Sequence, residues 1–348
     1  MKKKVAIISS IVIVIICIIL YLFLGLRSVS KESVQVKFNV RAGENKVKIV
    51  SNLKSAGLIR SKVSALAYVF LNPKLNLQAG TYTLDKSMDT KQIIKNINDG
   101  KIDEIVATKK ITFVEGRRIT DYLKQIEVNF GIKYDDMIKK LKDENFLDEL
   151  INKYDFLTSE IKNKSIYYSL EGYFYPDTYE FYENTSFENI INVVLNNLNQ
   201  KLSTVSNISG SKYSVHEILT MASIIEQEAV TTDDRAKVSQ VIYKRLDNNM
   251  SLGMDVTAYY GVQKSLKKPI TQGDLNSSNP YNTRLTSFIG LPVGPICNPS
   301  IISINAALNP ASTNYEYFYA DITTGKVYFS EDAQGFYEIQ EKLKLGDK

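Results

Sequence analysis

The chain has 348 residues, with 43 Lys and Arg against 38 Asp and Glu, a single histidine, two cysteines and no tryptophan. At 44% apolar and 23% charged residues, the composition is that of a globular protein and excludes a disordered or disulfide-rich chain. A zinc site with two or more histidines is excluded, and a hydrolytic triad would have to use His216 as its base. Cys17 lies in an apolar run far from Cys297 in the sequence, so we expect no disulfide and no cysteine cluster.

The net charge of +5 belongs to the N-terminus. Residues 1–31 hold five basic side chains and no acidic one, while the other 317 residues carry 38 basic and 38 acidic groups. A balanced globular part offers no broad positive field, so we expect no nucleic-acid partner.

Residues 5–26 form an uncharged apolar run that is long enough to cross a hydrocarbon core of roughly 30 Å. Three lysines precede the run, and only Arg27 and Lys31 follow closely, which predicts a cytoplasmic N-terminus. No small-residue cleavage site follows the run, so we expect a retained single-pass anchor rather than a signal peptide. This interpretation gives a cytoplasmic tail at 1–4, a transmembrane anchor at 5–26 and an extracytoplasmic remainder; the alternative is a buried core helix.

The next segments alternate strand and helix patterns. Residues 34–40 alternate apolar and polar side chains, which predicts a strand, and a helix with apolar positions from Val47 follows and ends at Gly57. A second helix ends at Gly100, and the strand–turn–helix pattern then returns over 111–126 as a weak internal repeat.

The C-terminal half predicts a larger domain with short strands. A charged amphipathic helical segment is expected over 127–165, followed by an aromatic block over 167–183 that Pro176 interrupts. Further helices are expected at 187–202, 215–229 and 233–248, then loops with short strands at 315–320 and 326–330. The predicted fold class is α+β, with an N-terminal module at 27–126, a helical connection at 127–165 and a larger domain at 166–348.

The helix expected at 215 carries the most distinctive chemistry. Ser214 and Glu217 form a capping box, and the helix has one apolar stripe made of Val215, Ile218, Leu219, Ala222 and Ile225. Glu226 falls inside this stripe, whereas Glu228 falls more than about 100° away, at its flank.

A carboxyl on the buried face of a helix has a raised pKa unless it is paired, and a raised pKa makes a glutamic acid a general acid near neutral pH. A lone acid of this kind suits glycosidic cleavage, because it can protonate the leaving oxygen. Twenty-two tyrosines suit a sugar-binding cleft, although most of them could simply pack the core. The alternative for Glu226 is an ion pair with a core arginine, either Arg235 or Arg245.

Several segments together resemble the MltG (YceG-like) family of membrane-anchored endolytic murein transglycosylases. They are LEGYFYPDTY at 170–179, LTMASIIEQEA at 219–229, DRAKVSQVIYKRL at 234–246, SLGMDVTAYYG at 251–261, NPYNTRL at 279–285 and GLPVGPICNPS at 290–300. FNVRAGENKVKIVSNL and ITFVEGRRITDYL are also similar to the LysM-like strand–helix units of that family. The resemblance covers about residues 34 to 340.

The resemblance implies an α+β catalytic domain behind LysM-like modules, and cleavage of peptidoglycan strands between N-acetylmuramic acid and N-acetylglucosamine. The products would carry 1,6-anhydro-N-acetylmuramic ends, which needs no cofactor, no metal and no water nucleophile. It places the catalytic glutamate on Glu226. It implies a substrate-binding role for the following residues: Glu171, Asp177, Tyr179, Glu228, Arg245, Asp255, Tyr281, Asn282 and Thr283.

Two other functions stay open at this point. A non-catalytic glycan-binding scaffold for peptidoglycan synthases would not need the acid at Glu226. A muramidase that uses water would need a second carboxylate about 5–9 Å from the first, for which Asp255 is the candidate.

Overall fold

The computed structural model describes residues 16–41, 43–100, 108–183, 185–208, 210–321 and 324–346. The chain divides into two compact units. The first consists of residues 1–109 and 180–183, and the second of residues 110–179 and 184–348. The division at residue 109 falls inside the segment 27–126 that the sequence predicts as one module.

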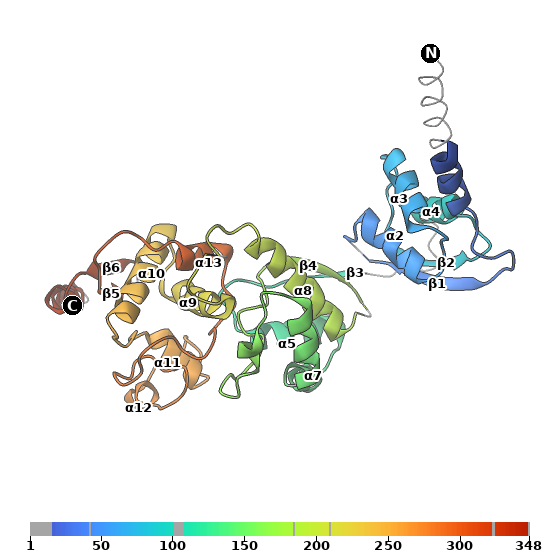
Figure 1. The fold of residues 1–348 in the computed structure, drawn as a ribbon. Helices are drawn as coiled ribbons and strands as arrows, with labels where there is room; N and C mark the ends of the chain where they lie inside the picture. The colour runs from blue at the N-terminus through green and yellow to red at the C-terminus, as the bar shows by residue number, and fades with distance from the viewer. Residues whose placement is uncertain are drawn as a thin grey trace, which may run out of the picture. The chain divides into compact units, whose positions relative to one another are not determined.

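The first unit is a two-stranded sheet covered by helices. Strands β1 (Gln35–Val40) and β2 (Gly80–Asp85) pair antiparallel, with Phe38 opposite Tyr82. Helices α2 (Lys46–Ser55) and α3 (Lys62–Leu71) connect the two strands, and α4 (Thr90–Asn98) follows them (Figure 1). Alternate strand residues and one face of each helix form a common core, which includes Val40, Leu53, Val69, Leu84 and Ile94.

The predicted strand at 34–40 and the two predicted helices are confirmed in this unit. Gly57 and Gly100 follow the C-caps of α2 and α4 with φ angles of 65° and 63°, the left-handed conformation that glycine adopts most easily. The sequence did not predict α3 or β2. Helix α3 has a high overall hydrophobicity that obscures its one-sided pattern.

The predicted anchor lies mostly outside the described residues. Residues 16–25 are helical, and residues 5–15 are not described. Within the described part of the chain, no helix combines the length and apolar character needed to cross a membrane. The anchor at 5–26 therefore stays a prediction.

The second unit begins with a mixed segment. Strands β3 (Thr108–Thr112) and β4 (Thr178–Tyr182) each have residues in both units, and the other elements of this segment are α5 (Ile119–Phe130), α6 (Tyr134–Leu141), α7 (Glu144–Lys153), the 3-10 helix η1 (Ser159–Lys162) and α8 (Phe187–Leu202). Strand β3 pairs with β4. The second copy of the predicted repeat, at 111–126, therefore has a strand whose partner comes from outside the repeat. The predicted segment 127–165 holds the end of α5 and then the separate elements α6, α7 and η1, because Gly131 ends α5 in the left-handed conformation and Asp143 starts α7 as its N-cap.

The remaining elements surround one central helix. They are α9 (Val215–Glu228), α10 (Thr232–Asp247), α11 (Asp255–Gly261), α12 (Gln272–Leu275), α13 (Ile301–Leu308), β5 (Tyr317–Ala320), β6 (Val327–Ser330) and α14 (Ala333–Gly346). Helix α9 packs against α10, α11 and α13 (Figure 1). Every residue from Ile218 to Ile225 is buried, so α9 is enclosed on all sides over that length.

The aromatic block at 167–183 packs the interior of this unit. Phe113 stacks on Tyr122 with ring centroids 4.4 Å apart and contacts Tyr179 at 5.6 Å. The Tyr173 hydroxyl lies 2.9 Å from Nδ1 of His216, and both residues are buried. This part of the block therefore stabilises the core.

Candidate active site

The last turn of α9 holds two carboxyl groups in different surroundings. The Glu226 side chain is only 4% exposed, and its Oε1 lies 2.9 Å from Nη2 of Arg235. Its Oε2 accepts hydrogen bonds from the backbone N–H of Ser300 at 2.9 Å and from the Ser300 hydroxyl at 2.6 Å. Ser300 is the N-cap of α13, so the carboxylate also lies at the positive end of a helix.

This geometry corresponds to the alternative that the sequence leaves open for Glu226, an ion pair with a core arginine. Both carboxylate oxygens are occupied by donors that stabilise the charged form. Protonating a leaving oxygen would require Glu226 to give up these bonds. The apolar stripe therefore identified a buried carboxyl correctly, but the structure gives it a partner.

Glu228 has no such partner. Within the described residues, its carboxyl makes no hydrogen bond and no ion pair, although part of the residue remains exposed. Desolvation and, to a smaller extent, the negative charge of Asp255 raise the pKa of Glu228 to about 8, against the opposing effect of Arg284. At neutral pH the side chain is consequently a neutral acid that can donate a proton.

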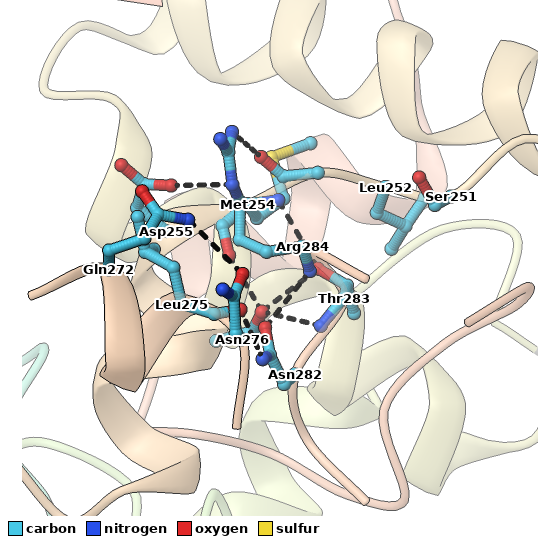
Figure 2. A network of polar contacts seen from close by, with 12 residues as sticks. Ser251, Leu252, Met254, Asp255, Gln272, Leu275, Asn276, Asn282, Thr283 and Arg284 are labelled. Atoms are coloured by element: carbon cyan, nitrogen blue, oxygen red, sulfur yellow. Dashed lines mark hydrogen bonds and ion pairs between the residues drawn. The ribbon is translucent and has the colours of Figure 1, made fainter. Parts of the chain in front are cut away.

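Asp255 and Arg284 form the polar surroundings of Glu228. Asp255 is the first residue of α11, and its Oδ1 lies 3.1 Å from Nε of Arg284 (Figure 2). Arg284 also donates from Nη1 to the Gly253 carbonyl at 3.2 Å. Both side chains are about half exposed, so the pair remains accessible from solvent.

A cleft of about 840 Å³ lies along the end of α9, within the size range of ligand sites. Glu226, Gln227 and Val256 line it, whereas Glu228 and Asp255, each next in sequence to one of these residues, are not among the lining residues. The other wall includes Glu115, Gly116, Arg117, Arg118, Asp121, Lys124, Tyr168, Tyr260 and Gln263.

Two contacts fix the cleft walls to one another. Gln227 donates from Nε2 to the Gly116 carbonyl at 2.7 Å, and a Cβ on Gly116 would come within 3.0 Å of that nitrogen. The Arg118 guanidinium lies 4.9 Å from the centre of the Tyr260 ring and donates to the Lys264 carbonyl. Together they hold a polar surface with aromatic faces, which suits a carbohydrate chain.

Glu171 does not contact this cleft directly. It is 1% exposed and accepts hydrogen bonds from the Ile119 N–H at 2.8 Å, the Tyr260 hydroxyl at 3.0 Å and Asn298 Nδ2 at 3.1 Å. Burial raises its pKa to about 7, against the effect of these donors. Glu171 therefore supports the start of α5 and the Tyr260 wall, and the predicted binding role is corrected to a positioning role.

Asp177 and Tyr179 lie beside α8 rather than at the cleft. The Asp177 carboxylate accepts from the Thr178 N–H and from Asn197 Nδ2 at 3.0 Å. The Tyr179 hydroxyl donates to the Tyr175 carbonyl at 2.6 Å, and its ring is buried. Neither residue is among those that line the cleft. Asp177, which follows Pro176, instead fixes the turn before β4 through its bond from the Thr178 N–H.

Arg245 is also structural. Its Nε donates to the Glu316 carbonyl at 2.8 Å and its Nη1 to the Leu252 carbonyl at 2.7 Å, while the guanidinium lies 5.1 Å from the Tyr317 ring centre. These bonds fix the loop before α11 to β5, and Arg245 is not among the residues that line the cleft.

The loop at 281–283 is entirely buried, contrary to the prediction that it would present hydrogen bonds to sugars. Asn282 donates from Nδ2 to the carbonyls of Leu275 and Ser277, at 2.8 and 2.7 Å. The Thr283 hydroxyl accepts from the Met254 N–H at 3.2 Å (Figure 2). Tyr281 is fully buried and packs edge-on against Tyr260, with ring centroids 4.7 Å apart.

This loop instead sets the position of its neighbours. Asn282 Oδ1 accepts from the Arg284 N–H at 3.1 Å, and Thr283 contacts the segment just before Asp255. The Asp255–Arg284 pair is therefore held from both sides by buried polar residues.

Sequence reasoning missed Arg118, Gln227, Tyr260 and Arg284. All four lie inside the family-like segments of the sequence, but their residue types carry no specific chemical signal. Within the residues that the structure describes, no three His, Cys, Asp or Glu side chains are grouped to hold a metal ion.

The comparisons with known proteins identify the family of the chain. The YceG-like family model matches residues 38–342, and the chain belongs to that family. The endolytic murein transglycosylase of Bacillus subtilis strain 168 is 36% identical over 321 residues, covering 91% of this chain and 87% of the relative. The enzyme of the same name from Streptococcus pneumoniae strain D39 is 31% identical over 316 residues, covering 86% of this chain and 56% of the relative.

A solved structure supports the fold. The 2.6 Å crystal structure of the yceG-like protein lmo1499 from Listeria monocytogenes is 34% identical in sequence, with a TM-score of 0.62. The match covers 88% of this chain and all of that chain. The mixed α+β class expected from the sequence is thereby confirmed.

Replacing Glu226 with Gln should destabilise the protein. The change leaves the buried Arg235 without its counter-charge, which typically costs about 3 kcal/mol of unfolding free energy. Urea-induced unfolding of the full chain would measure this loss. Asp233→Asn removes one partner of an exposed pair on α10 and should cost less than about 1 kcal/mol. Equal stability of the Glu226→Gln variant and the wild type would contradict the role given to the pair.

Replacing Asn282 with Ala should also lower stability rather than act on substrate binding alone. The variant loses two donors to buried carbonyls, for which we expect about 1–3 kcal/mol. The neighbouring Asn276 is exposed, and Asn276→Ala should change the unfolding free energy by at most about 0.5 kcal/mol. If Asn282→Ala left the unfolding free energy unchanged but weakened glycan binding, Asn282 would have to contact the sugar directly.

Proposed function

We propose that this chain is an endolytic murein transglycosylase that cleaves the bond between N-acetylmuramic acid and N-acetylglucosamine inside glycan strands. The observation that carries the proposal is the unpaired, desolvated carboxyl of Glu228 in the last turn of α9, the turn whose residues Glu226 and Gln227 line the polar cleft. The similarity over most of the chain to two relatives named endolytic murein transglycosylase supports the reaction type.

Glu228 performs both proton transfers in this mechanism. As a neutral acid it protonates the glycosidic oxygen while the bond from that oxygen to the anomeric carbon breaks. The resulting carboxylate then accepts the proton of the sugar's own 6-hydroxyl, whose oxygen bonds to the anomeric carbon. The product is a 1,6-anhydro end, no water is consumed, and Glu228 ends protonated as it began.

We assign the catalytic role to Glu228 rather than to Glu226 because the Glu228 carboxyl has no partner and a raised pKa, whereas the Glu226 carboxylate is paired with Arg235. An acid must carry a proton before the reaction, and the raised pKa of Glu228 provides it. Glu226 is held by Arg235 and Ser300, and in our proposal it fixes the end of α9 against α13. The Asp255–Arg284 pair supplies opposite charges near Glu228, which adjust its pKa in opposite directions.

Two alternatives give different products. A water-using muramidase with Asp255 as its second carboxylate would leave reducing ends, and Asp255 is engaged with Arg284 instead. A glycan-binding scaffold would leave the strands intact and would have no use for an unpaired acid at the cleft.

We further propose a single-pass membrane protein with a cytoplasmic N-terminus and an extracytoplasmic catalytic unit. The support is the apolar run at 5–26 with three preceding lysines. Peptidoglycan synthases are the partners that such a location suggests.

Replacing Glu228 with Gln should lower the rate of anhydro-end formation by about 10²–10⁴-fold, because Gln can neither donate nor accept the proton. Mass spectrometry of digested glycan strands measures the anhydro ends. The matched variant Glu226→Gln should retain most of the activity per folded molecule. If Glu226→Gln abolished cleavage in the folded fraction while Glu228→Gln did not, the assignment would be reversed.

The pH dependence provides a second test of Glu228. The acid must be protonated, so kcat/KM should fall as pH rises through about 8. Glu171 titrates near 7, and Glu171→Gln identifies any contribution from that residue. Burial favours the protonated form of Glu228, so its contribution to stability is complete below the unfolded pKa of 4.5 and is lost as pH rises to about 8. Glu228→Gln should therefore hold or raise the melting temperature at pH 8.

The topology can be tested with a reporter fused after Lys348. An enzyme that folds only outside the cytoplasm should be active in this fusion, since the three lysines retain the N-terminus inside. Digestion of the C-terminal unit by protease added to sealed inside-out vesicles would contradict the proposed orientation.

A further inference from the structure

A second pocket of about 640 Å³ opens beside the cleft. It lies among α6, α7 and the segment at 162–169. Tyr134, Tyr168 and Gln263 line both this pocket and the cleft, so the two form one continuous groove in the second unit. The glycosidic chemistry proposed above uses only the cleft and leaves this side pocket unassigned.

Two lysines in the side pocket have no counter-ion. Lys142, Lys162 and Lys164 line it, and Lys162 is paired with Asp148 at 2.7 Å. Among the described residues, the side chains of Lys142 and Lys164 make no ion pair and no hydrogen bond, and both are exposed. They can therefore bind carboxylates of a ligand without first breaking a bond within the protein.

The rest of the lining is of mixed character. Asp135 and Glu144 lie in the first turns of α6 and α7, where they can accept an amine, and Ile138, Leu147 and Ile166 supply apolar surface. A pocket with free lysines, carboxylates and short apolar side chains matches a small zwitterionic peptide better than a neutral sugar.

We propose that the side pocket binds the short peptide that branches from the muramic acid residues of the glycan strand. This peptide combines free carboxylates, an amine and small methyl groups, and its attachment to the sugar places it next to the cleft. The inference rests on the proposed function, since it requires a murein strand in the cleft. In this arrangement, Lys142 and Lys164 select strands that carry peptides and orient them for cleavage in the adjoining cleft.

The test compares two substrates: glycan strands with their peptides, and the same strands after an amidase has removed the peptides. The wild-type full chain should have a higher kcat/KM on the strands with peptides. Lys142→Ala/Lys164→Ala should lower that value by about tenfold, through a higher KM, because two charge-assisted contacts are lost, and should leave the bare strands unaffected. A matched variant, Lys139→Ala/Lys342→Ala, removes the same charge outside both pockets and should behave as the wild type.

Equal losses on both substrates, or a wild-type enzyme that does not distinguish them, would overturn the peptide pocket while leaving the transglycosylase activity intact. Failure of the wild type to cut either substrate would instead overturn the proposed function. In that case, calorimetry with the free peptide tests the pocket alone. Binding to the wild type that the Lys142/Lys164 variant lacks supports the proposal, and equal or absent binding refutes it.

Discussion

The enclosure of α9 is the constraint on which the site depends. A helix surrounded by protein from Ile218 to Ile225 leaves its last turn only partly in contact with water, so a carboxyl at that end is stabilised either by a partner or by keeping its proton. Glu226 remains charged because Arg235 and Ser300 surround it. Glu228 receives no such donors and keeps its proton. The same desolvation therefore produces a structural anion and a chemical acid two residues apart.

Other segments of the second unit hold the surroundings of Glu226 and Glu228 in place. The buried loop at 281–283 fixes Arg284 beside Asp255, and the contact of Gln227 with Gly116 fixes the opposite wall of the cleft. The polar residues of these segments are largely engaged with backbone groups. These residues act by holding other residues in position, and a ligand would contact the residues that line the cleft.

Much of the local structure could be predicted from the sequence, because caps and apolar spacing act over a few residues. The helix at 187–202 and the capping box at Ser214 are confirmed. Helices α11 to α14 were missed, since the short ones among them are fixed by tertiary packing and their sequences are rich in Gly, Pro and Asn. Gly131, which divides the predicted segment after 126, is visible in the sequence, but the break itself was not predicted.

The site was harder to predict, because an apolar stripe shows that a side chain is buried without showing what it meets. Glu226 and Arg235 are nine residues apart, yet nothing in their spacing excludes Glu228 as the partner of that arginine. The family-like segments at 170–179 and 279–285 suggested ligand contacts, whereas Glu171, Tyr281, Asn282 and Thr283 are buried. The polar residues of these motifs form hydrogen bonds with other buried groups of the protein, so a long polar motif does not by itself identify a substrate contact.

The Glu171 cluster has a consequence for how the second unit folds. Its carboxyl joins partners 52, 89 and 127 positions away in the sequence, at Ile119, Tyr260 and Asn298. Bonds between such distant positions close large loops, so they form only after most of the unit has assembled. Until then this carboxyl stays hydrated, and the Tyr260 wall of the cleft lacks its support. Completion of the cleft is thus tied to the last steps of folding, and a partly folded or proteolytically shortened unit would have the acid without the groove that presents the substrate to it.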